Sequence, residues 1–474
     1  MLKLGWGKED ITPIGEICEK VSLLGQFYER ITDVVRDPIY ATALAIESAE
    51  GVKTAIVSLD LSIVPQRLMS EARKKVKILA PDFPSDALIM AATHVHTGPH
   101  IEADFLSDVW GSRFALPNHP GVLTAEAFLD FVAEKVAIAV SKAWESRATG
   151  GVGIAFGRVA VPQSRRVCYK DGSVRMYGTT STEDFLRIEG GADTGVEYLV
   201  TYDANQKLSG LVINLACPAQ ILEHESYISA DLWGEVRRQW PECPYILPLC
   251  GAAGDIAMRD LVRQGKSELD MHCEKGMMRQ ANQIVRESQY VISEIFSEDI
   301  LDDTPVRHER RIISLPLRRV SDEEYNAAKA IYDAFEREYE VNDFSKDYED
   351  GIKLRMQDRT FYARAAGIVN RYQLQAEVNV VEMEIHALRL GEMALVTNPF
   401  ELYQDYAMQI KARSPARQTM IAQLSCGSFV YLPTELGIKG GSYSTYVSDG
   451  FIGPEGGQLL VEKTLDMLQN LYPV

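Results

Sequence analysis

Three of the chain's eight histidines fall within residues 89–105 (IMAATHVHTGPHIEADF). His94 and His96 are separated by one residue, and His100 follows a Gly-Pro pair. In an extended backbone, residues i and i+2 point to the same side, so His94 and His96 can converge on one ion. Neutral imidazole is a common ligand of zinc and other first-row metals. The pattern therefore favours either a metal site or, alternatively, a hydrogen-bonded histidine pair at a strand end.

Three further stretches place side chains of ligand or acid/base type just after apolar runs. The stretches are residues 215–235 (LACPAQILEHESYISADLWGE), 249–260 (LCGAAGDIAMRD) and 397–406 (TNPFELYQDY), and the side chains are Cys217, Glu223, His224, Glu225, Asp231, Asp255 and Glu401. Strand ends are where sites gather in an α/β layer. Each residue also has an ordinary explanation, as a helix-start carboxylate, a turn former or a surface side chain.

The elements that would position these residues alternate between strands and helices. Residues 38–62 read as two β-rich runs joined at a Glu-Gly turn, 64–79 as an amphipathic helix, and 87–93 as a short buried strand. This order fits an α/β layer with a crossover. Further strands are predicted in 150–161, 208–218, 245–255 and 380–399, and further helices over 124–146 and 458–471.

Residues 321–372 differ in texture, because they are rich in Glu, Lys, Asp and Arg with helical spacing. They predict a two-helix excursion with one solvated face. No linker, repeat or low-complexity tract interrupts the chain. We therefore expect one mixed α/β (α+β) domain over residues 1–474, with layered mixed sheets flanked by helices and a helical insertion at 321–372.

Composition narrows the classes of partner. Hydrophobic residues make up 46% and charged residues 24% of the chain, which is typical of soluble globular proteins. The net charge of −18 disfavours nucleic acid and anionic membranes, and no stretch reaches the roughly 20 apolar residues of a membrane helix. The N-terminus has no signal-like run, and seven scattered cysteines indicate reduced thiols. The prediction is a cytoplasmic protein acting on a small molecule, either alone or as a homo-oligomer.

Two features could form the walls of a pocket. Arg165, Arg166 and Arg175 flank a Lys-Asp-Gly turn and predict either an anion clamp or a solvated hairpin. Residues 437–457 form a long Gly/Ser/Tyr segment without regular periodicity, and such loops are uncommon unless functional. Its residues Tyr443 and Tyr446 suit stacking on a sugar or an amide. These tyrosines, the arginines and His100 at the rim are the predicted substrate-binding residues.

In collinear order, the motifs resemble the N-terminal catalytic domain of the neutral and alkaline non-lysosomal ceramidases and their bacterial relatives. ATHVHTGP resembles that family's Thr-His-Thr-His-Ser-Gly-Pro motif, and GWGKEDITP its opening Gly-x-x-x-x-Asp-Ile-Thr-Pro. The segments SADLWGE, GAAGDIAM, NPFEL and GSFVYLPT resemble its later motifs. The resemblance covers nearly the whole chain, implies that family's layered fold, and leaves out its extra C-terminal β-domain.

The resemblance implies a zinc ion held by two histidines, a glutamate and a tyrosine, with water as the attacking group. Carried over residue by residue, the ligands fall on His94, Glu401 and Tyr431, and His96 falls beside the metal and the substrate. Zinc is the expected ion, although another divalent metal would also suit. His96 or a carboxylate such as Asp231 or Asp255 would then move the proton.

Two departures from the family pattern bear on the substrate. The family's second zinc histidine precedes a proline, and the dipeptide here is Cys217-Pro218. His224 is the preferred substitute, because a Cys217 thiolate would soften the Lewis acid. The family's proposed serine nucleophile falls on Ala257, so serine chemistry cannot operate there. With the missing C-terminal domain and secretion signal, this points away from ceramide.

The resulting prediction is a metal-dependent hydrolase that uses a metal-activated water on an amide or related polar bond of a small soluble substrate. One alternative is a metal-dependent carbohydrate-active enzyme (a glycosidase, lyase or isomerase), because several carboxylates accompany the histidines. Another alternative is a non-catalytic binding protein on the same fold.

Overall fold

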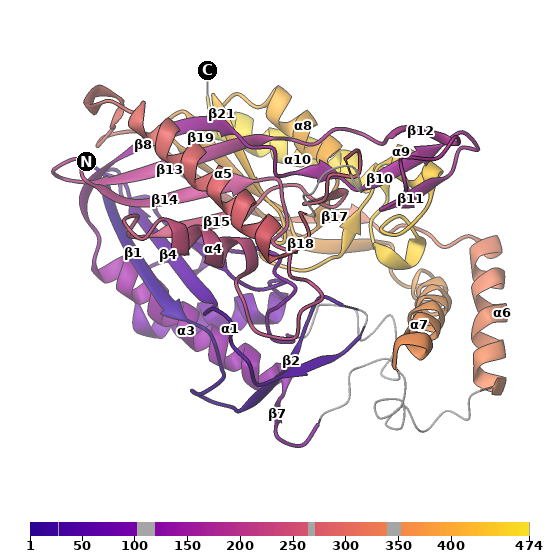
Figure 1. The fold of residues 1–474 in the computed structure, drawn as a ribbon. Helices are drawn as coiled ribbons and strands as arrows, with labels where there is room; N and C mark the ends of the chain where they lie inside the picture. Colours follow the sequence, from indigo (N-terminus) through magenta and orange to yellow (C-terminus); the bar gives the residue numbers. More distant parts are fainter. Residues whose placement is uncertain (27, 102–118, 264–270, 339–351, 474) are drawn as a thin grey trace.

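The computed structural model describes residues 1–26, 28–101, 119–263, 271–338 and 352–473 (Figure 1). Within these residues the largest sheet has eight strands in the order β15-β14-β13-β8-β1-β4-β5-β6. In chain order the strands are β1 (Lys3–Asp10), β4 (Tyr40–Glu47), β5 (Lys53–Leu59), β6 (Leu88–Ala92), β8 (Ala148–Arg158), β13 (Gly195–Asp203), β14 (Leu208–Leu215) and β15 (Ile246–Cys250).

The sheet is mixed because two crossovers interrupt its antiparallel pairing. Strands β4 and β5 pair antiparallel, whereas β5 and β6 pair parallel and are joined by helix α1 (Gln66–Leu79). Strands β14 and β15 also pair parallel, and helix α4 (Asp231–Gln239) lies between them in the chain. The strand–helix–strand unit expected over residues 38–93 is confirmed, and so is the mixed α/β class.

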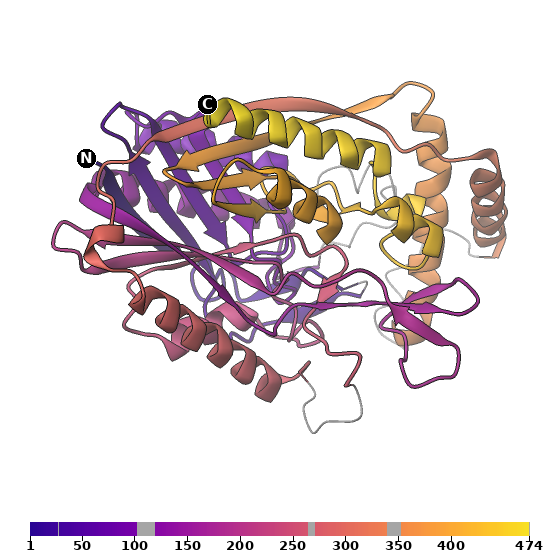
Figure 2. The same cartoon turned by 90° about the horizontal axis from the view of Figure 1, so that it is seen from above.

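Helices cover both sides of the eight-stranded sheet (Figure 2). Helix α3 (Ala125–Glu145) lies directly on β1, where a Cβ added at Gly5 or Gly7 would stand 2.0 Å from a carbonyl oxygen of the helix. Only glycine permits this approach. Helix α5 (Glu274–Ser293) packs with α4 against β13 and β14 in a separate apolar cluster.

A second sheet of four strands has the order β17-β18-β19-β21, and its bounds are Val306–Pro316, Val380–Leu390, Met393–Thr397 and Gln418–Ala422. Helices α8 (Gln404–Arg413) and α10 (Pro454–Leu471) pack against it. Asn214 of β14 joins the two sheets: its amide donates to the Leu249 and Ile421 carbonyl oxygens, and the Ile421 N–H donates back to it.

Short elements complete the structure. The small sheets have the orders β3-β2-β7 (Arg30–Thr32, Lys20–Leu23, Val122–Leu123), β11-β10-β12 (Val174–Met176, Arg166–Tyr169, Phe185–Ile188), β16-β9 (Ile256–Ala257, Gln163–Ser164) and β20-β22 (Glu401–Leu402, Tyr431–Leu432). The 3-10 helices η1 (Ser85–Ala87) and η3 (Ser297–Asp299) lie in connections.

The described parts of residues 321–372 are largely helical. Helices α6 (Asp322–Glu338) and α7 (Ile352–Leu374) lie at one end of the molecule in Figure 1. The segment expected to be irregular, 437–457, is only partly so. It contains most of helix α9 (Glu435–Gly440), which Thr434 caps by accepting from the Gly437 N–H, and the 3-10 turn η5 (Val447–Asp449).

No helix in the described ranges has the length and apolar character needed to span a bilayer. All seven cysteines lie in the part of the chain that the structure describes, and none of them is paired with another there.

Candidate metal centre

The ends of three strands bring His94, Glu401 and Tyr431 together. His94 follows β6 after one residue, and its Nε2 lies 3.2 Å from Glu401 Oε2. Glu401 and Tyr431 face each other across the parallel ladder of β20 and β22, and burial, together with the Glu401 charge, raises the pKa of Tyr431. The His94 and Glu401 side chains therefore meet, and Tyr431 lies beside Glu401.

The backbone and the second ring nitrogen of His94 fix the direction of its Nε2. His94 has a φ of 65°, which is uncommon outside glycine. Its Nδ1 lies 2.7 Å from the Ser62 carbonyl oxygen and donates to it, so the Nε2 lone pair faces Glu401. Val430, directly before Tyr431, has a φ of 59°. Such strained residues concentrate at functional sites.

The three donors are buried, and their charge suits a cation. His94 is 4% exposed and Tyr431 is 5% exposed. Burial acts to raise the pKa of Glu401, but His94, Tyr431 and Arg165 together hold it below its usual value. Burial and the Glu401 charge raise the pKa of Tyr431. The site therefore offers an ionised carboxylate beside a neutral phenol.

This donor set fits a divalent metal ion such as zinc. Zinc accepts imidazole nitrogen and carboxylate oxygen at about 2.0–2.2 Å, so two of its ligand atoms in a tetrahedral site stand roughly 3.3–3.5 Å apart. The 3.2 Å between His94 Nε2 and Glu401 Oε2 is close to that separation. His94, Glu401 and Tyr431 would hold the ion.

Arg165 and Tyr443 lie next to these donors. Arg165 is buried; its guanidinium donates to the Gly254 carbonyl oxygen at 2.7 Å and lies 5.5 Å from the ring centroid of Tyr431. The phenol oxygens of Tyr431 and Tyr443 lie 3.3 Å apart. A fixed positive charge and two hydroxyl groups thus border the point where the donors meet.

Gly254 makes this arrangement sterically feasible. A Cβ at Gly254 would stand 2.4 Å from the Glu401 carbonyl oxygen. The small-residue turn after β15 therefore lies directly against β20, and its carbonyl group holds Arg165 in place.

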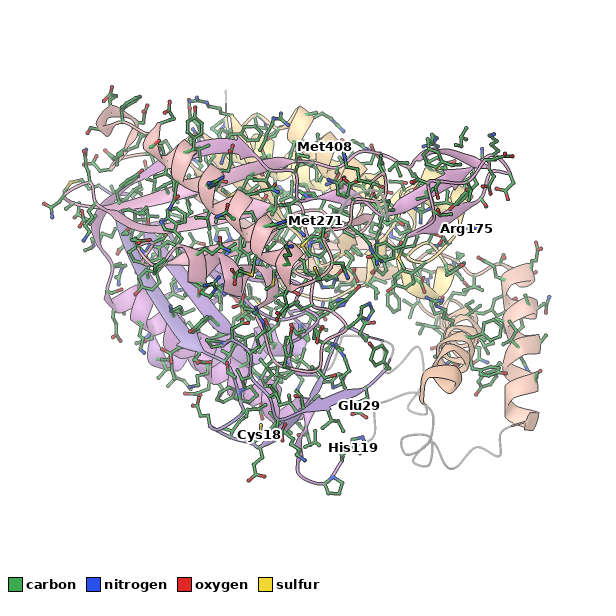
Figure 3. All side chains as sticks on the ribbon, viewed as in Figure 1. Cys18, Glu29, His119, Arg175, Met271 and Met408 are labelled. Carbon is green, nitrogen blue, oxygen red and sulfur yellow. The ribbon has the colours of Figure 1, made fainter. Side chains whose placement is uncertain are left out.

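The other two arginines of the predicted clamp point elsewhere. Arg166 is buried; it donates to Glu189 and to the carbonyl oxygens of Gly437 and Gly441. It therefore holds the segment that carries Tyr443. Arg175 is exposed at the outer edge of the β10–β11 hairpin, over the Tyr169 ring (Figure 3). Of the three arginines in the described part of the chain, Arg165 is the one whose guanidinium lies over the ring of Tyr431.

His96 lies beside the first donors and faces a second group. Its ring centroid is 4.9 Å from that of His94. Its Nε2 lies 2.8 Å from Gln220 Nε2, and its Nδ1 lies 3.5 Å from Glu223 Oε2. Burial lowers the pKa of His96, so the imidazole is neutral near pH 7.

Neither predicted fourth ligand meets the three donors. The His224 side chain is 63% exposed; its Nε2 lies 3.6 Å from Glu223 Oε1 and its Nδ1 lies 3.3 Å from the Tyr28 hydroxyl. Cys217 lies in the apolar cluster with Val95 and Trp233, and burial raises the pKa of its thiol. In the described part of the chain, no hydrogen bond or ion pair joins either residue to His94, Glu401 or Tyr431.

The two predicted proton carriers, Asp231 and Asp255, accept hydrogen bonds from backbone N–H groups. The Asp231 carboxylate accepts from the N–H groups of Ile221, Leu222 and Leu232. Asp255 accepts from the Gln404 N–H at the start of α8. Burial raises the pKa of each to about 6.

The predicted pocket walls are partly assembled by α7. Arg364 of α7 lies 5.3 Å from the ring centroids of both Tyr443 and Tyr446, and Tyr446 is 45% exposed. His100 lies at the edge of β2, where its N–H donates to the Ser22 carbonyl oxygen. Sequence reasoning missed Arg364, because nothing in a charged helix marks which of its side chains turn inward.

Two more residues were missed. Arg30 is 4% exposed, and its guanidinium donates to the carbonyl oxygens of Leu24, His96, Glu223 and Glu225. His272 Nε2 lies 3.5 Å from Glu223 Oε1. No sequence pattern predicts that Arg30 lies at the site. His272, an isolated histidine before an amphipathic helix in a histidine-poor chain, could have been found.

A second group of ligand-type atoms lies away from this centre. One atom each of Glu384, His386 and Cys426 lies within 4.8 Å of the others. However, the Glu384 carboxylate already accepts from Arg73, Arg310 and His386, and burial raises the pKa of Cys426 to about 12. Two guanidinium groups and a protonated thiol disfavour a cation there.

No family model matches the sequence, and no curated protein matches it. The solved structures that share the fold include two ceramidases. One is the neutral ceramidase from Pseudomonas aeruginosa, with a TM-score of 0.71 and 16% identity over 100% of this chain and 75% of that chain. The other is a ceramidase complexed with C2, with a TM-score of 0.70 and 15% identity over 99% of this chain and 75% of that one. The resemblance to neutral ceramidases inferred from the motifs is thus confirmed for the fold.

Proposed function

We propose that this chain is a metal-dependent hydrolase that holds zinc through His94, Glu401 and Tyr431 and cleaves an amide or related polar bond in a small soluble substrate. The observation that carries the proposal is the meeting of His94 Nε2 and Glu401 Oε2 beside the Tyr431 hydroxyl. Catalytic zinc sites use three protein ligands and leave one position open, which fits the separation of His224 and Cys217 from this point.

A bound zinc ion would supply a water of lowered pKa and would polarise the scissile carbonyl group. The chain's own groups act around it. The Arg165 guanidinium and the Tyr443 hydroxyl border Tyr431, where they can stabilise negative charge on the carbonyl oxygen as the bond is attacked. Burial strengthens this contribution, because few water molecules screen the charges.

His96 is the group best placed to move the proton. Its imidazole is neutral, lies next to His94 and is oriented by Gln220. It can accept a proton from the attacking water and return it to the leaving nitrogen. Asp231 and Asp255, whose carboxylates bind backbone N–H groups, would act by holding the surrounding loops in place.

The walls support a polar substrate. Tyr443, Tyr446 and Arg364 present aromatic faces and a cation, where an acyl chain as long as that of ceramide would need apolar surface. Ala257 is buried in β16 and offers no nucleophile. Seven free thiols support a reducing compartment such as the cytoplasm. We therefore propose a water-soluble amide as the substrate class.

Metal analysis and substrate panels test the proposal together. Protein purified without chelator should contain zinc, and it should hydrolyse members of a panel of N-acyl amino acids, N-acyl amino sugars and short-chain ceramides. Glu401→Gln and His94→Ala should each lose the metal and the activity. His119→Asn is the matched control, because His119 pairs with Glu29 outside the centre (Figure 3).

Two outcomes would contradict the proposal. Metal-free protein whose His94→Ala variant keeps full activity would remove the metal from the mechanism. Turnover confined to glycosides would favour a carbohydrate-active enzyme, and ligand binding without turnover on any panel member would favour a binding protein.

A further inference from the structure

A cavity of about 380 Å³ is lined by side chains of β1, β4 and α4 (Figure 1) and of the segments next to them. Its described lining does not include the donors of the candidate metal centre, and its volume is in the range of small-molecule sites. Lys8, Arg36, Arg237 and Arg238 all contribute to it. The chain has a net charge of −18 and as a whole repels anions. We call this exception to the general charge the Lys8 cavity.

Two of these cations lie over the same aromatic ring. Lys8 Nζ is 4.7 Å and Arg237 Cζ is 5.6 Å from the centroid of the Tyr40 ring. Burial and the Arg237 charge lower the pKa of Lys8, whereas Asp60 and Asp10 act in the opposite direction. The two positive charges therefore repel each other, and an anion bound by both would relieve this repulsion.

The carboxylates near the cavity are already engaged. Asp60 is fully buried and accepts from the Arg237 guanidinium at 2.6 Å and 3.2 Å. Asp37 and Glu235 each accept from an arginine and from further donors. Lys8 differs, because it is exposed and, among the described residues, forms no ion pair with a carboxylate. Its ammonium group can therefore bind a ligand, and Arg237 keeps N–H groups beyond the two that bind Asp60.

The rest of the wall favours a compact organic anion over a free ion. Trp240 and three prolines, Pro38, Pro241 and Pro244, line the cavity together with Tyr40. Proline rings restrict the backbone, and aromatic rings provide contact area for an apolar or aromatic body. Lysine and arginine bind carboxylate and phosphate groups through charge-assisted hydrogen bonds.

The Arg237–Asp60 pair connects this cavity to the candidate metal centre. Asp60, Leu61 and Ser62 are consecutive, and Arg237 binds the first of them. The His94 N–H donates to the Leu61 carbonyl oxygen at 2.9 Å, and His94 Nδ1 lies 2.7 Å from the Ser62 carbonyl oxygen. One three-residue segment thus contacts an arginine of the cavity at one end and a predicted metal ligand at the other.

We infer that the Lys8 cavity binds a small organic anion through Lys8 and Arg237, and that the bound anion strengthens metal binding at His94. The anion carries a carboxylate or phosphate group on a compact apolar body. A ligand that orders Arg237 also orders Asp60 and the two residues after it, which orient the imidazole. Binding of the anion requires the cavity alone, whereas its effect on the metal rests on the proposed function. Such coupling is reciprocal, so the metal would strengthen anion binding by the same factor.

Isothermal titration calorimetry on the full-length protein tests the binding, with phenyl phosphate and benzoate as probes. We expect at least one probe to bind, and its Kd to rise about tenfold in Lys8→Met, as for the loss of a hydrogen bond to a charged group. The tighter probe identifies the anionic group. Lys53→Met is the matched control and should bind the probe normally. Lys53 also lies over an aromatic ring, 5.3 Å from the Trp144 centroid, and is not part of the cavity's described lining.

Glu401→Gln separates the cavity from the metal centre, because an anion could also bind directly to a zinc ion. The probe should still bind to Glu401→Gln. Loss of binding in Glu401→Gln but not in Lys8→Met would place the probe on the metal, which overturns the inference and supports the proposed function. Absence of binding for both probes would also overturn it. In soaked crystals, probe density between Lys8 and Arg237 supports the site, and density at the metal centre alone contradicts it.

Zinc titrations against a competing chelator test the coupling. Saturating probe should lower the Kd of zinc about fivefold in the unmodified protein and by much less in Lys8→Met. Zinc that the probe binds in solution is the same in both titrations, so the difference belongs to the protein. An equal change in both proteins would overturn the link to His94 and leave the proposed function intact. Probe binding by a protein that takes up no zinc would support the cavity and contradict the proposed function.

Discussion

The candidate metal centre and the buried group around Glu384 both contain glutamate and histidine. They differ in the charge of the groups that contact the carboxylates. Glu384 accepts from two arginines and a histidine, and His386 in turn lies 2.8 Å from His308. We call these residues, with Arg73 and Arg310, the Glu384 network. Glu223 and Glu401 meet imidazoles and a phenol, and their contacts with histidine are 3.2–3.6 Å long.

This difference separates a structural carboxylate from a receptive one. In the Glu384 network the guanidinium groups saturate the carboxylate and fix helix α1 to strands β17 and β18. In the candidate metal centre, neutral or weakly basic donors surround the carboxylates and leave lone pairs directed inward. The presence of glutamate and histidine alone therefore does not indicate metal binding. Whether arginine side chains already pair with the carboxylate is more informative.

The largest expected effect is that of Glu401→Gln on activity. The amide keeps the shape of the carboxylate but removes its charge, so the ion loses an anionic ligand. We expect kcat/KM to fall by about 10⁴-fold, because metal polarisation is worth several kcal/mol. Steady-state kinetics on a substrate found in the panel measures this. An unchanged kcat/KM would place the chemistry elsewhere.

The second prediction concerns the Glu384 network and its contribution to stability. Glu384→Gln leaves the half-buried Arg73 and the exposed Arg310 without their carboxylate, which costs about 1–3 kcal/mol of the free energy of unfolding. Urea unfolding measures it. Zinc content should remain unchanged, because the network holds no ion. A loss of zinc in this variant would show that the network, with Cys426, is itself a metal site.

Removing the metal gives the third prediction. Zinc at 100 times its Kd stabilises the folded state by about 2.7 kcal/mol per site. Chelation should therefore lower Tm in the unmodified protein and less so in Glu401→Gln. In Glu384→Gln, zinc should raise Tm by the same increment as in the unmodified protein. Equal zinc increments in the unmodified and Glu401→Gln proteins would leave Glu401 out of the metal site.

A third kind of buried carboxylate, bound by backbone N–H groups, gives the smallest expected effect, which is on the pH dependence of stability. Asp231 accepts from backbone N–H groups only, and burial raises its pKa from 3.8 to about 6. Between these values the folded state binds more protons than the unfolded state, so stability is lost as pH rises, by about 1 kcal/mol per pH unit.

Glu223 has the opposite effect on the pH dependence of stability. Despite its burial, His96 and the other imidazoles lower its pKa to about 2, so its contribution is lost below roughly pH 4.5.

Urea unfolding between pH 4 and 6.5 tests this sign. Asp231→Asn should show a shallower decline of stability with rising pH than the unmodified protein. Asp255 carries a similar shift, so the slope is reduced by the share of one group. A steeper decline in Asp231→Asn would contradict the assignment.

Much of the fold was predictable because its elements carry local signals. The apolar run that forms β6, the amphipathic α1 and the charged helices α6 and α7 each display their periodicity within one segment. The short helix α9 was missed, because its sequence, ELGIKG, is dominated by glycine and by a Thr434 cap that reads equally well as a loop.

The site residues that belong to a motif could be predicted from the sequence. Contacts between segments that are distant in the sequence could not. His94, Glu401 and Tyr431 follow from the family resemblance, and the structure places them together. The Glu223–His272 contact joins residues 49 positions apart, and His272 belongs to none of the motifs. Arg166 was expected to face a substrate, but three backbone or carboxylate partners turn it inward. Hydrogen-bond partners of this kind are fixed by tertiary packing, which a local pattern cannot show.

The two-residue ladder between β20 and β22 limits how this protein can vary. Side chains alternate along a strand, so a shift of one residue in either strand exchanges a polar donor for its neighbour. The neighbours are Leu402 and Leu432, both fully buried in the apolar cluster. A single-residue insertion or deletion before Glu401 or Tyr431 would therefore replace a ligand by leucine in one step. Length changes in α6 or α7 leave the ladder untouched, so descendants of this sequence can gain new specificities at its periphery more readily than a new metal ligand set at its centre.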